Sequence, residues 1–440
     1  MTDSIRVRRF IRITALALVF CLAAASAWAG AIPPGATMLE VPETGGLLKI
    51  GKILPLADGS VVIGGQVQYP GERRRPHKTD YQDPQDMVRN DAIAMRLDAS
   101  GALLWTIRLG DPQADNHFSP LGLLPDGRIL LSFWAEDSSF GDRLFIVGLD
   151  GVVEEMLPWR TMAAHFPPRS MMFMPQSGYL GGDSTVVDFY YDYHTGPLGR
   201  RYHTESQEMA LLDFDLSEVW RFDLLPLDSI VNDYLAAQVS DGIVLLGMTW
   251  ESACTSLVKL DGLTGEVLWQ LTDEPRGNRS LSHGAYGLAE TPEGELLFTG
   301  AFLEPGRTLD GGEPFVTLTK ITADGAHVWT KRYEDMDLLL LYNIVPFKNG
   351  YVMRGIRQSS WNSFLFLYVD ADGELLGTLA IGEEADRTSV WPLLAAAPDG
   401  TVYIAGSIET VYDREKATRG ELMGSYLGIL EVEHFSIPTN

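Results

Sequence analysis

LVKLDGLTGEVLWQL, residues 257–271, has a looser copy in AMRLDASGALLWTIRL, residues 94–109. Each copy has an apolar run, an Asp, a short turn that ends in Gly, and a second apolar run with a Trp four residues after the Gly. In the second run of the looser copy, Leu103, Trp105, Ile107 and Leu109 fall on one side of an extended chain. Each copy therefore predicts two antiparallel β-strands joined by a tight turn.

The phrase alternates along the chain with a second repeated signal, an Asp-Gly-type turn between short apolar runs, as in LLPDGRILLSF and AAPDGTVYIAG. Glycine adopts positive φ without steric cost, so we expect tight two-residue hairpins at these turns. The glycines of this second signal are Gly59, Gly127, Gly178, Gly242, Gly294, Gly350 and Gly400. The first phrase recurs with Gly101, Gly151, Gly265, Gly325 and Gly373, and in degraded form in LLDFDLSEVWRFDL.

Two hairpins per repeat make a unit of four antiparallel strands, which is typical of a β-propeller blade. Seven units predict an all-β fold, a seven-bladed β-propeller of four-stranded antiparallel blades. The last unit has only three strands, and the segment ATMLEVPE at 36–43 has the spacing of a missing fourth strand. We therefore expect this N-terminal strand to complete the last blade and close the ring, which removes an exposed edge. The repeated tryptophans are expected to pack between neighbouring blades.

The first 29 residues predict a secretory signal peptide. Four arginines precede the apolar run ITALALVFCLAAA, and small residues Ala27 and Ala29 end the segment as a cleavage site. Residues 30–440 are expected to form a single propeller domain, secreted or periplasmic, with no membrane span after cleavage. We expect a monomer.

The formal net charge of −25 argues against nucleic acid as a partner, since phosphate contacts need clustered Lys and Arg. The predicted signal peptide contributes basic residues, so the remainder is more acidic still. Only Cys254 remains after cleavage, which excludes an internal disulfide and leaves a large apolar core to stabilise the fold.

The stretch KLDGLTGEVLW at 259–269 resembles the tryptophan-docking repeat of PQQ-like (quinoprotein-like) β-propellers. Asp261, Thr264, Gly265 and Trp269 match that repeat, and Lys259 replaces its alanine. The resemblance implies a secreted or envelope protein of the non-catalytic branch. The quinone-binding members carry eight blades and a disulfide of adjacent cysteines, which this chain lacks, so we expect no cofactor.

Strand order places the tight turns at one face of the predicted disc and the longer insertions, at 66–91, 186–208, 302–313 and 407–424, at the other. Tyr and Arg are enriched where proteins recognise partners. Two insertions are rich in these residues and in His, so we expect the loop-rich face to bind a protein or glycan; solvated loops of balanced charge are the alternative interpretation. The candidate binding residues are Arg73, Arg74, Arg75, His77, Tyr191, Tyr193, Arg200, Arg201 and Tyr202.

Three histidines at that face, His117, His165 and His283, are candidate metal ligands if they converge on the axis; separate polar residues at the rim are the simpler interpretation. No catalytic motif of the nucleophile-elbow, phosphate-loop or zinc-protease type occurs. The sequence therefore favours a non-catalytic binding scaffold. The alternative is a propeller enzyme, a glycan hydrolase or lyase, with its site at the central mouth of the loop-rich face.

Overall fold

The structure, a computed structural model, describes most of the chain from residue 33 to residue 436. Within that part the chain is strand and turn, apart from one 3-10 helix, η3 (Val432–His434). The predicted signal peptide lies outside the described residues. The described ranges are 33–39, 46–73, 88–110, 116–124, 126–135, 143–158, 186–195, 201–212, 218–223, 231–249, 255–272, 287–302, 315–334, 336–357, 363–382, 387–410 and 422–436.

The described strands form seven antiparallel sheets, numbered here in chain order, six with four strands and one with three. Sheet 1 contains β2 (Leu47–Pro55), β3 (Val61–Arg73), β4 (Val88–Leu97) and β5 (Leu103–Leu109). Sheet 2 contains β6 (Asn116–Leu123), β7 (Ile129–Ala135), β8 (Arg143–Val147) and β9 (Val153–Pro158). Sheet 3 contains β10 (Val186–Thr195), β11 (Arg201–Leu212) and β12 (Glu218–Asp223).

Sheet 4 contains β13 (Val231–Val239), β14 (Gly242–Thr249), β15 (Thr255–Asp261) and β16 (Val267–Thr272). Sheet 5 contains β17 (Leu288–Glu290), β18 (Leu296–Phe302), β19 (Phe315–Ile321) and β20 (His327–Tyr333). Sheet 6 contains β21 (Leu338–Phe347), β22 (Gly350–Arg357), β23 (Phe364–Asp370) and β24 (Leu375–Ile381). Sheet 7 contains β25 (Arg387–Ala396), β26 (Val402–Thr410) and β27 (Leu422–Ile429), with β1 (Thr37–Leu39) beside β27.

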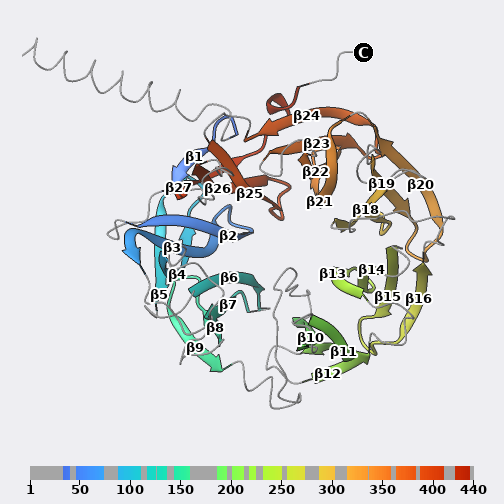
Figure 1. Ribbon diagram of the computed structural model, residues 1–440, viewed down its shortest axis with the longest axis horizontal. Coiled ribbons are helices and arrows are strands. Elements are labelled where there is room, and N and C mark those ends of the chain that lie inside the picture. The colour runs from blue at the N-terminus through green and yellow to red at the C-terminus, as the bar shows by residue number, and fades with distance from the viewer. Residues whose placement is uncertain are drawn as a thin grey trace, which may run out of the picture.

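The sheets are arranged around a common centre, with β2, β6, β13, β21 and β25 innermost (Figure 1). Neighbouring sheets pack through apolar seams; one core cluster, for example, joins Val62 of sheet 1 to Phe118 and Phe133 of sheet 2. This is the arrangement of a β-propeller. The N-terminal strand β1 pairs antiparallel with β27, Met38 opposite Tyr426, so the fourth strand of sheet 7 comes from the start of the chain. Residues 40–43 of the predicted segment lie outside the described residues.

Most of the described tight turns are three-residue loops, one residue longer than expected. The β13–β14 and β21–β22 turns have the expected two residues, since Val239 pairs with Gly242 and Phe347 with Gly350. In the first hairpin, Leu56 N donates to Ser60 O at 2.8 Å, which leaves residues 57–59 as the loop. Gly59 has a φ of 79° and ends the loop. The carboxylate of Asp58 accepts from the Ser60 amide at 2.9 Å. This side-chain hydrogen bond stabilises the loop. A three-residue loop that ends in a glycine with positive φ is a common hairpin connection.

The repeated tryptophans pack across the seams, as predicted. Each indole lies against the turn glycine of the next sheet, where a Cβ would clash with the ring at Gly151 and Gly265. Three of the indoles also donate to a carbonyl of that turn. The pairs are Trp105 with Leu149 O at 3.0 Å, Trp220 with Gly262 O at 3.2 Å and Trp269 with Ala323 O at 2.9 Å. The Gly in one copy of the repeated phrase therefore contacts the Trp of the preceding copy.

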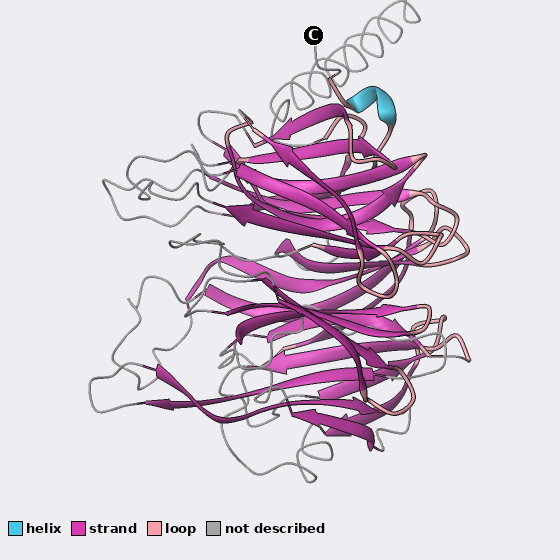
Figure 2. Cartoon of the chain, turned by 90° about the vertical axis from the view of Figure 1, so that its right-hand side faces the viewer, coloured by secondary structure: helices cyan, strands magenta, loops and turns pink. Residues whose placement is uncertain are grey.

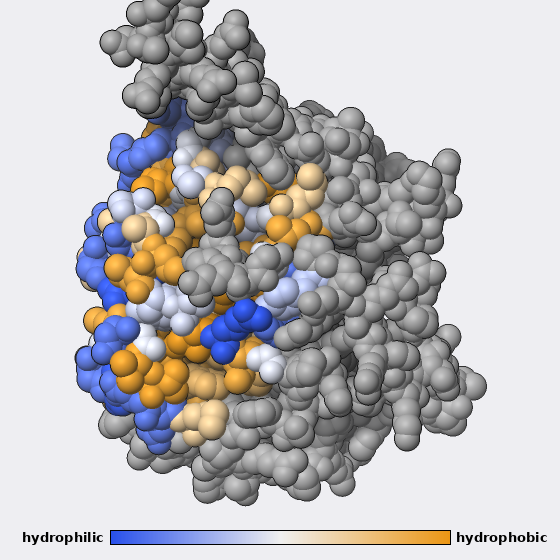
Figure 3. Space-filling model, turned by 90° about the vertical axis from the view of Figure 1, so that its left-hand side faces the viewer, coloured by the Kyte–Doolittle hydropathy of each residue, from blue (hydrophilic) through white to orange (hydrophobic). Residues whose placement is uncertain are grey.

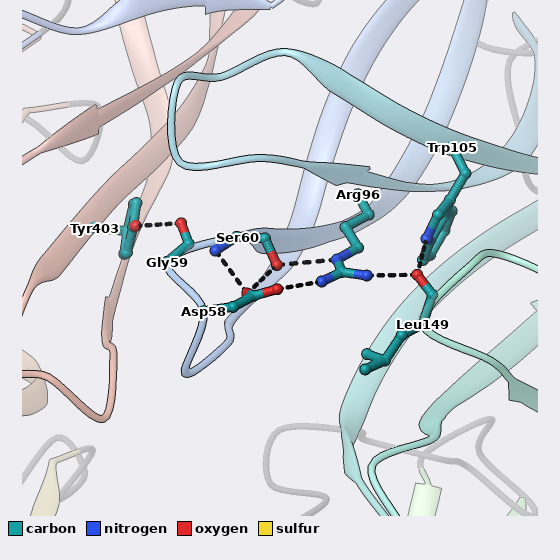
Figure 4. Close-up of polar contacts among 7 residues, drawn as sticks. All are labelled: Asp58, Gly59, Ser60, Arg96, Trp105, Leu149 and Tyr403. Atoms are coloured by element: carbon teal, nitrogen blue, oxygen red, sulfur yellow. Dashed lines mark hydrogen bonds and ion pairs between the residues drawn. The ribbon is translucent and has the colours of Figure 1, made fainter.

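A buried cation beside the Trp reinforces two of these seams. Arg96, directly opposite Trp105 in the ladder, donates to the same Leu149 carbonyl at 2.5 Å and to Asp58 at 2.5 Å (Figure 4). Lys259, opposite Trp269, likewise donates to Ala323 O at 3.0 Å and to Asp241 at 2.8 Å. The lysine that departs from the tryptophan-docking repeat is thus a structural donor, which joins one sheet to the next.

Sheet 6 lacks this Trp and receives an aromatic ring from the end of the described chain. Gly377 occupies the Trp position, opposite Tyr368. Phe435, which follows η3, packs against Gly377 and lies 5.5 Å from the Tyr368 ring and 5.9 Å from the Phe347 ring. The next residue, Ser436, exchanges two backbone hydrogen bonds with Thr378 on β24, of 2.8 and 3.0 Å. The C-terminal segment therefore joins sheet 7 back to sheet 6.

Candidate functional site

The two ends of the ring differ in what their side chains do. The described tight turns gather at one side of the molecule (right in Figure 2). Their carboxylates are committed to structure: Asp98 accepts from Ser100 and Ala102, and Asp261 from Leu263 and Thr264. These hydrogen bonds hold the pKa of both carboxyls below its usual value. At the tight-turn end these carboxylates thus stabilise the turns that contain them.

The opposite end carries the links between second and third strands. The sequence predicts loop insertions at 66–91 and 186–208, and this prediction is wrong for their ends. β3 continues to Arg73, which pairs with Val88 of β4, and β10 and β11 stay paired from Val186 to Thr195. The strand pairing extends outward because Tyr, Val and Thr favour extended backbone. What was expected as a loop is in sheet 3 a β-ribbon.

The β10–β11 ribbon carries four of the predicted binding residues. Its pairing with β12 ends where Glu208 meets Asp223, and Glu208 lies opposite Tyr190. Beyond that point the ribbon continues on its own through Tyr191, Tyr193 opposite His203, and Thr195 opposite Arg201. Tyr202 lies opposite His194. The backbone thus brings Tyr191, Tyr193, Arg201 and Tyr202 together on one projecting element.

The other predicted binding residues are not brought to this ribbon within the described structure. Arg73 ends β3 in sheet 1. Arg74, Arg75, His77 and Arg200 lie outside the described residues. The two predicted basic clusters therefore belong to different sheets, and only the cluster on sheet 3 has a described scaffold.

Of the three candidate metal ligands, only His117 falls within the described residues, since His165 and His283 lie outside them. His117 is the second residue of β6, and its ring lies against Gly51 of β2, where a Cβ would clash with it. In the part of the chain that the structure describes, no group of three or more His, Cys, Asp or Glu side chains could hold a metal ion.

The innermost strand of sheet 1 carries a basic residue that sequence analysis missed. A bulge interrupts the β2–β3 ladder between Ile50 and Lys52, so Gly51 lies outside the regular pairing. Lys52 pairs with Gly64 and is flanked by buried Ile50 and Ile53. Burial lowers the pKa of the Lys52 amine to about 8. The position of Lys52 on the innermost strand, beside the bulge and the His117 ring, makes it a candidate ligand or reaction site.

Polar contacts near the same end of sheet 1 have structural roles. The buried Asp91 carboxylate accepts from the Tyr69 hydroxyl at 2.9 Å and from Arg108 Nε at 2.8 Å. Lys49 reaches Glu409 of sheet 7 at 3.2 Å. These groups satisfy one another across β2, β3, β4 and β5 and across the seam to sheet 7.

The signal for Lys52 was present in the sequence. The strand LLKIGKILP places two lysines and a glycine in an otherwise apolar run, and VVIGGQV places two adjacent glycines in the next strand. Glycine inside a strand marks a bulge or a close backbone approach. The two features together identify a seam with a basic group.

The outer strands expose apolar side chains in a scattered pattern. Leu104 and Leu268 are half exposed, and Val153 and Val328 are similar. On the side of the molecule in Figure 3, hydrophobic residues are interspersed with hydrophilic ones. No helix in the described part of the chain is long and apolar enough to cross a membrane.

Comparison with known proteins finds solved structures with a similar chain path and finds no matching family. No family model matches, and no curated protein matches. A lignostilbene dioxygenase of Pseudomonas brassicacearum is similar with a TM-score of 0.46 and 9% identity, over 91% of this chain and 95% of that one. The GH93 α-L-arabinofuranosidase of Fusarium graminearum has a TM-score of 0.44 and 8% identity, over 74% and 95%. The WD40 domain of SCAP from fission yeast has 0.41 and 8%, over 88% and 90%.

Proposed function

We propose that the chain is a seven-bladed β-propeller, closed by β1, that acts outside the cytoplasm as a non-catalytic scaffold. Its end opposite the tight turns binds a protein or glycan partner, and the β10–β11 ribbon is the main contact. The repeat style resembles the non-catalytic PQQ-like propellers of secreted and envelope proteins, which supports this assignment of class and location.

One observation carries the proposal: the ribbon projects beyond its sheet. Strands within a sheet are stabilised by neighbours on both sides, whereas the part of β10 and β11 beyond Glu208 has no pairing to β12. That part is dense in Tyr, His and Arg. Such residues supply most of the binding energy in protein interfaces, and packing of the sheets does not need them.

The test is a capture experiment with the purified chain from residue 30, immobilised and exposed to the envelope and matrix fraction of the producing cell. A triple variant, Arg200→Ala, Arg201→Ala, Tyr202→Ala, is expected to lose roughly tenfold or more of the captured partner. Its melting temperature should stay nearly unchanged, because surface changes typically cost within about 0.5 kcal/mol. High salt should weaken the capture, since exposed charges are screened.

Asp126→Ala and Asp399→Ala are the matched controls, because both residues lie in tight turns at the opposite end. Both controls should capture the partner as the unmodified chain does. If the triple variant captures normally while a control fails, the binding face is the tight-turn end and the proposal is wrong. Conversion of a captured glycan to smaller products would instead favour the enzyme alternative.

A further inference from the structure

We propose that the seam between the innermost strands β2 and β6 is a binding site for a small anion that carries a carboxylate or phosphate group, with Lys52 as the charged ligand and His117 beside it. The site lies in sheets 1 and 2, away from the β10–β11 ribbon, and does not depend on the proposed partner binding.

The geometry of the seam comes from two glycines. A Cβ at Gly64 would lie 2.6 Å from the Phe118 carbonyl oxygen, and a Cβ at Gly51 would clash with the His117 ring. The absence of side chains at these positions lets β6 approach β2 and β3 closely. Lys52 is paired with Gly64, and paired residues share one face of a sheet. Lys52 therefore lies on the face of sheet 1 that meets β6, next to Gly51, which contacts the His117 ring.

The half-buried Lys52 differs from the buried basic residues Arg96, Lys259 and Arg354 in that no described residue supplies it with a counter-charge or acceptor. Arg96 and Lys259 each contact a carboxylate, and Arg354 donates to the Pro392 carbonyl at 2.5 Å. For Lys52, the described residues supply neither a hydrogen bond nor an ion pair, and the lowered pKa reflects burial with no opposing charge. An ammonium that has lost water without gaining a partner is costly, and a bound anion restores the missing interaction.

The chemistry around the amine fits a small anion. Lys52 offers up to three N–H donors, and the imidazole ring of His117 lies against the same bulge. Gly51 is exposed and lies outside the ladder pairing, so the backbone at the bulge is accessible. A bulge on the innermost strand is a common device for aiming groups at a ligand. The protein has a formal net charge of −25, so most of its basic groups have carboxylates nearby. A basic group to which no described carboxylate is paired therefore favours an anionic ligand.

The experiment is calorimetric titration of the purified chain with inorganic phosphate and, separately, with acetate, at constant ionic strength and pH 7. We expect saturable binding of at least one of the two anions, and the two arms show whether the site takes a phosphate or a carboxylate. Lys52→Met should weaken that binding roughly tenfold or more, the loss expected for a charged hydrogen-bonding ligand. Lys348→Met, at an exposed lysine of sheet 6, is the control and should bind as the unmodified chain does.

Lys52→Met keeps the aliphatic stem and removes a half-buried charge, so it should fold with an unchanged or higher melting temperature. As a second readout, acetylation of lysines by acetic anhydride, followed by mass spectrometry, should show Lys52 protected by the bound anion and Lys348 unaffected. No saturable binding of either anion overturns the proposal, as does binding that Lys52→Met leaves intact or protection that is equal at the two lysines.

Discussion

The seam between sheets 4 and 5 and the seam between sheets 6 and 7 need the same kind of aromatic filler but obtain it from different parts of the chain. In the first, Trp269 on β16 covers Gly325 and donates to the carbonyl of Ala323. In the second, the equivalent position is Gly377, and Phe435 enters from beyond η3. The seam geometry is thus set by the repeat, while the ring that fills it can come from a distant segment.

The seam between sheets 7 and 1 shows a third solution. The strand β1 carries no Trp, and serines of β26 and β27 bind the backbone of β2 directly. Ser407 Oγ accepts from Ile50 N at 3.0 Å, Ser425 Oγ donates to the Leu48 carbonyl, and the two hydroxyls are 2.9 Å apart. Tyr403 adds a hydrogen bond to Gly59 O at 3.0 Å. Both ends of the described chain therefore take part in seams that the repeat does not complete.

Removal of β1 should have the largest effect on stability. A chain that starts at residue 45 loses the strand paired with β27 and exposes that edge. We expect its melting temperature in a thermal scan to fall on the order of 10 °C, or the protein to aggregate. A chain that starts at residue 33 keeps β1 and is the control. Equal melting temperatures for the two chains would contradict closure by β1.

Loss of the Phe435 ring should come next. The residue is 7% exposed and belongs to the core cluster that joins sheets 6 and 7. Phe435→Ala should therefore cost about 3–5 kcal/mol of unfolding free energy, measured by denaturant titration. Val432→Ala, at a residue of η3 that is 46% exposed, should cost no more than about 0.5 kcal/mol.

A second variant sharpens this comparison. If the seam needs an aromatic ring from either source, combining Gly377→Trp with Phe435→Gly should restore part of the lost stability, because sheets 1, 3, 4 and 5 carry Trp at that position. Glycine is used at 435 because the Cβ of Phe435 would meet a side chain at residue 377. A Phe435→Ala effect as small as that of Val432→Ala would show that the tail does not support the seam.

The repeat made the fold predictable because each part of the phrase has a local physical cause. Asp caps the turn, Gly permits positive φ, and the Trp alternates onto the buried side, so strand, turn and seam follow from spacing alone. The spacing of Met38 also predicted the pairing of β1 with β27. Phe435 was not predictable, because no pattern in HFSIP indicates that the segment returns to sheet 6.

The candidate sites were less predictable than the fold. Tyr191 and Arg201 were recognised from composition, but their ribbon required knowledge of where pairing to β12 stops. Lys52 was not predicted because a lysine in a strand usually reaches solvent, and its partial burial depends on how closely β6 approaches Gly51 and Gly64. Whether such a site forms depends on distances between segments that are far apart in the sequence.

A smaller effect should separate two tryptophans of the repeat. Trp269 donates its indole N–H to Ala323 O at 2.9 Å, whereas the described residues offer the Trp329 indole no acceptor. Trp269→Phe should therefore cost about 1–1.5 kcal/mol more unfolding free energy than Trp329→Phe, which loses packing alone. Denaturant titration of the two variants measures the difference. Equal costs would mean that the indole hydrogen bond adds nothing to the seam.

The smallest effect should be confined to a single turn and should depend on pH. Asp98 accepts from Ser100 Oγ at 2.6 Å and from the Ala102 amide at 2.9 Å, and these bonds hold its pKa below the usual value. A carboxyl whose pKa is lower in the folded state stabilises the fold above its unfolded pKa of about 3.9, and this contribution is lost as pH falls through the folded value. Asp98→Asn keeps an acceptor but does not titrate. The melting temperature of Asp98→Asn should therefore lie slightly below that of the unmodified chain at pH 7, and the two should become equal near pH 2. A difference that persists or grows in acid would show that the charge of Asp98 does not stabilise the turn.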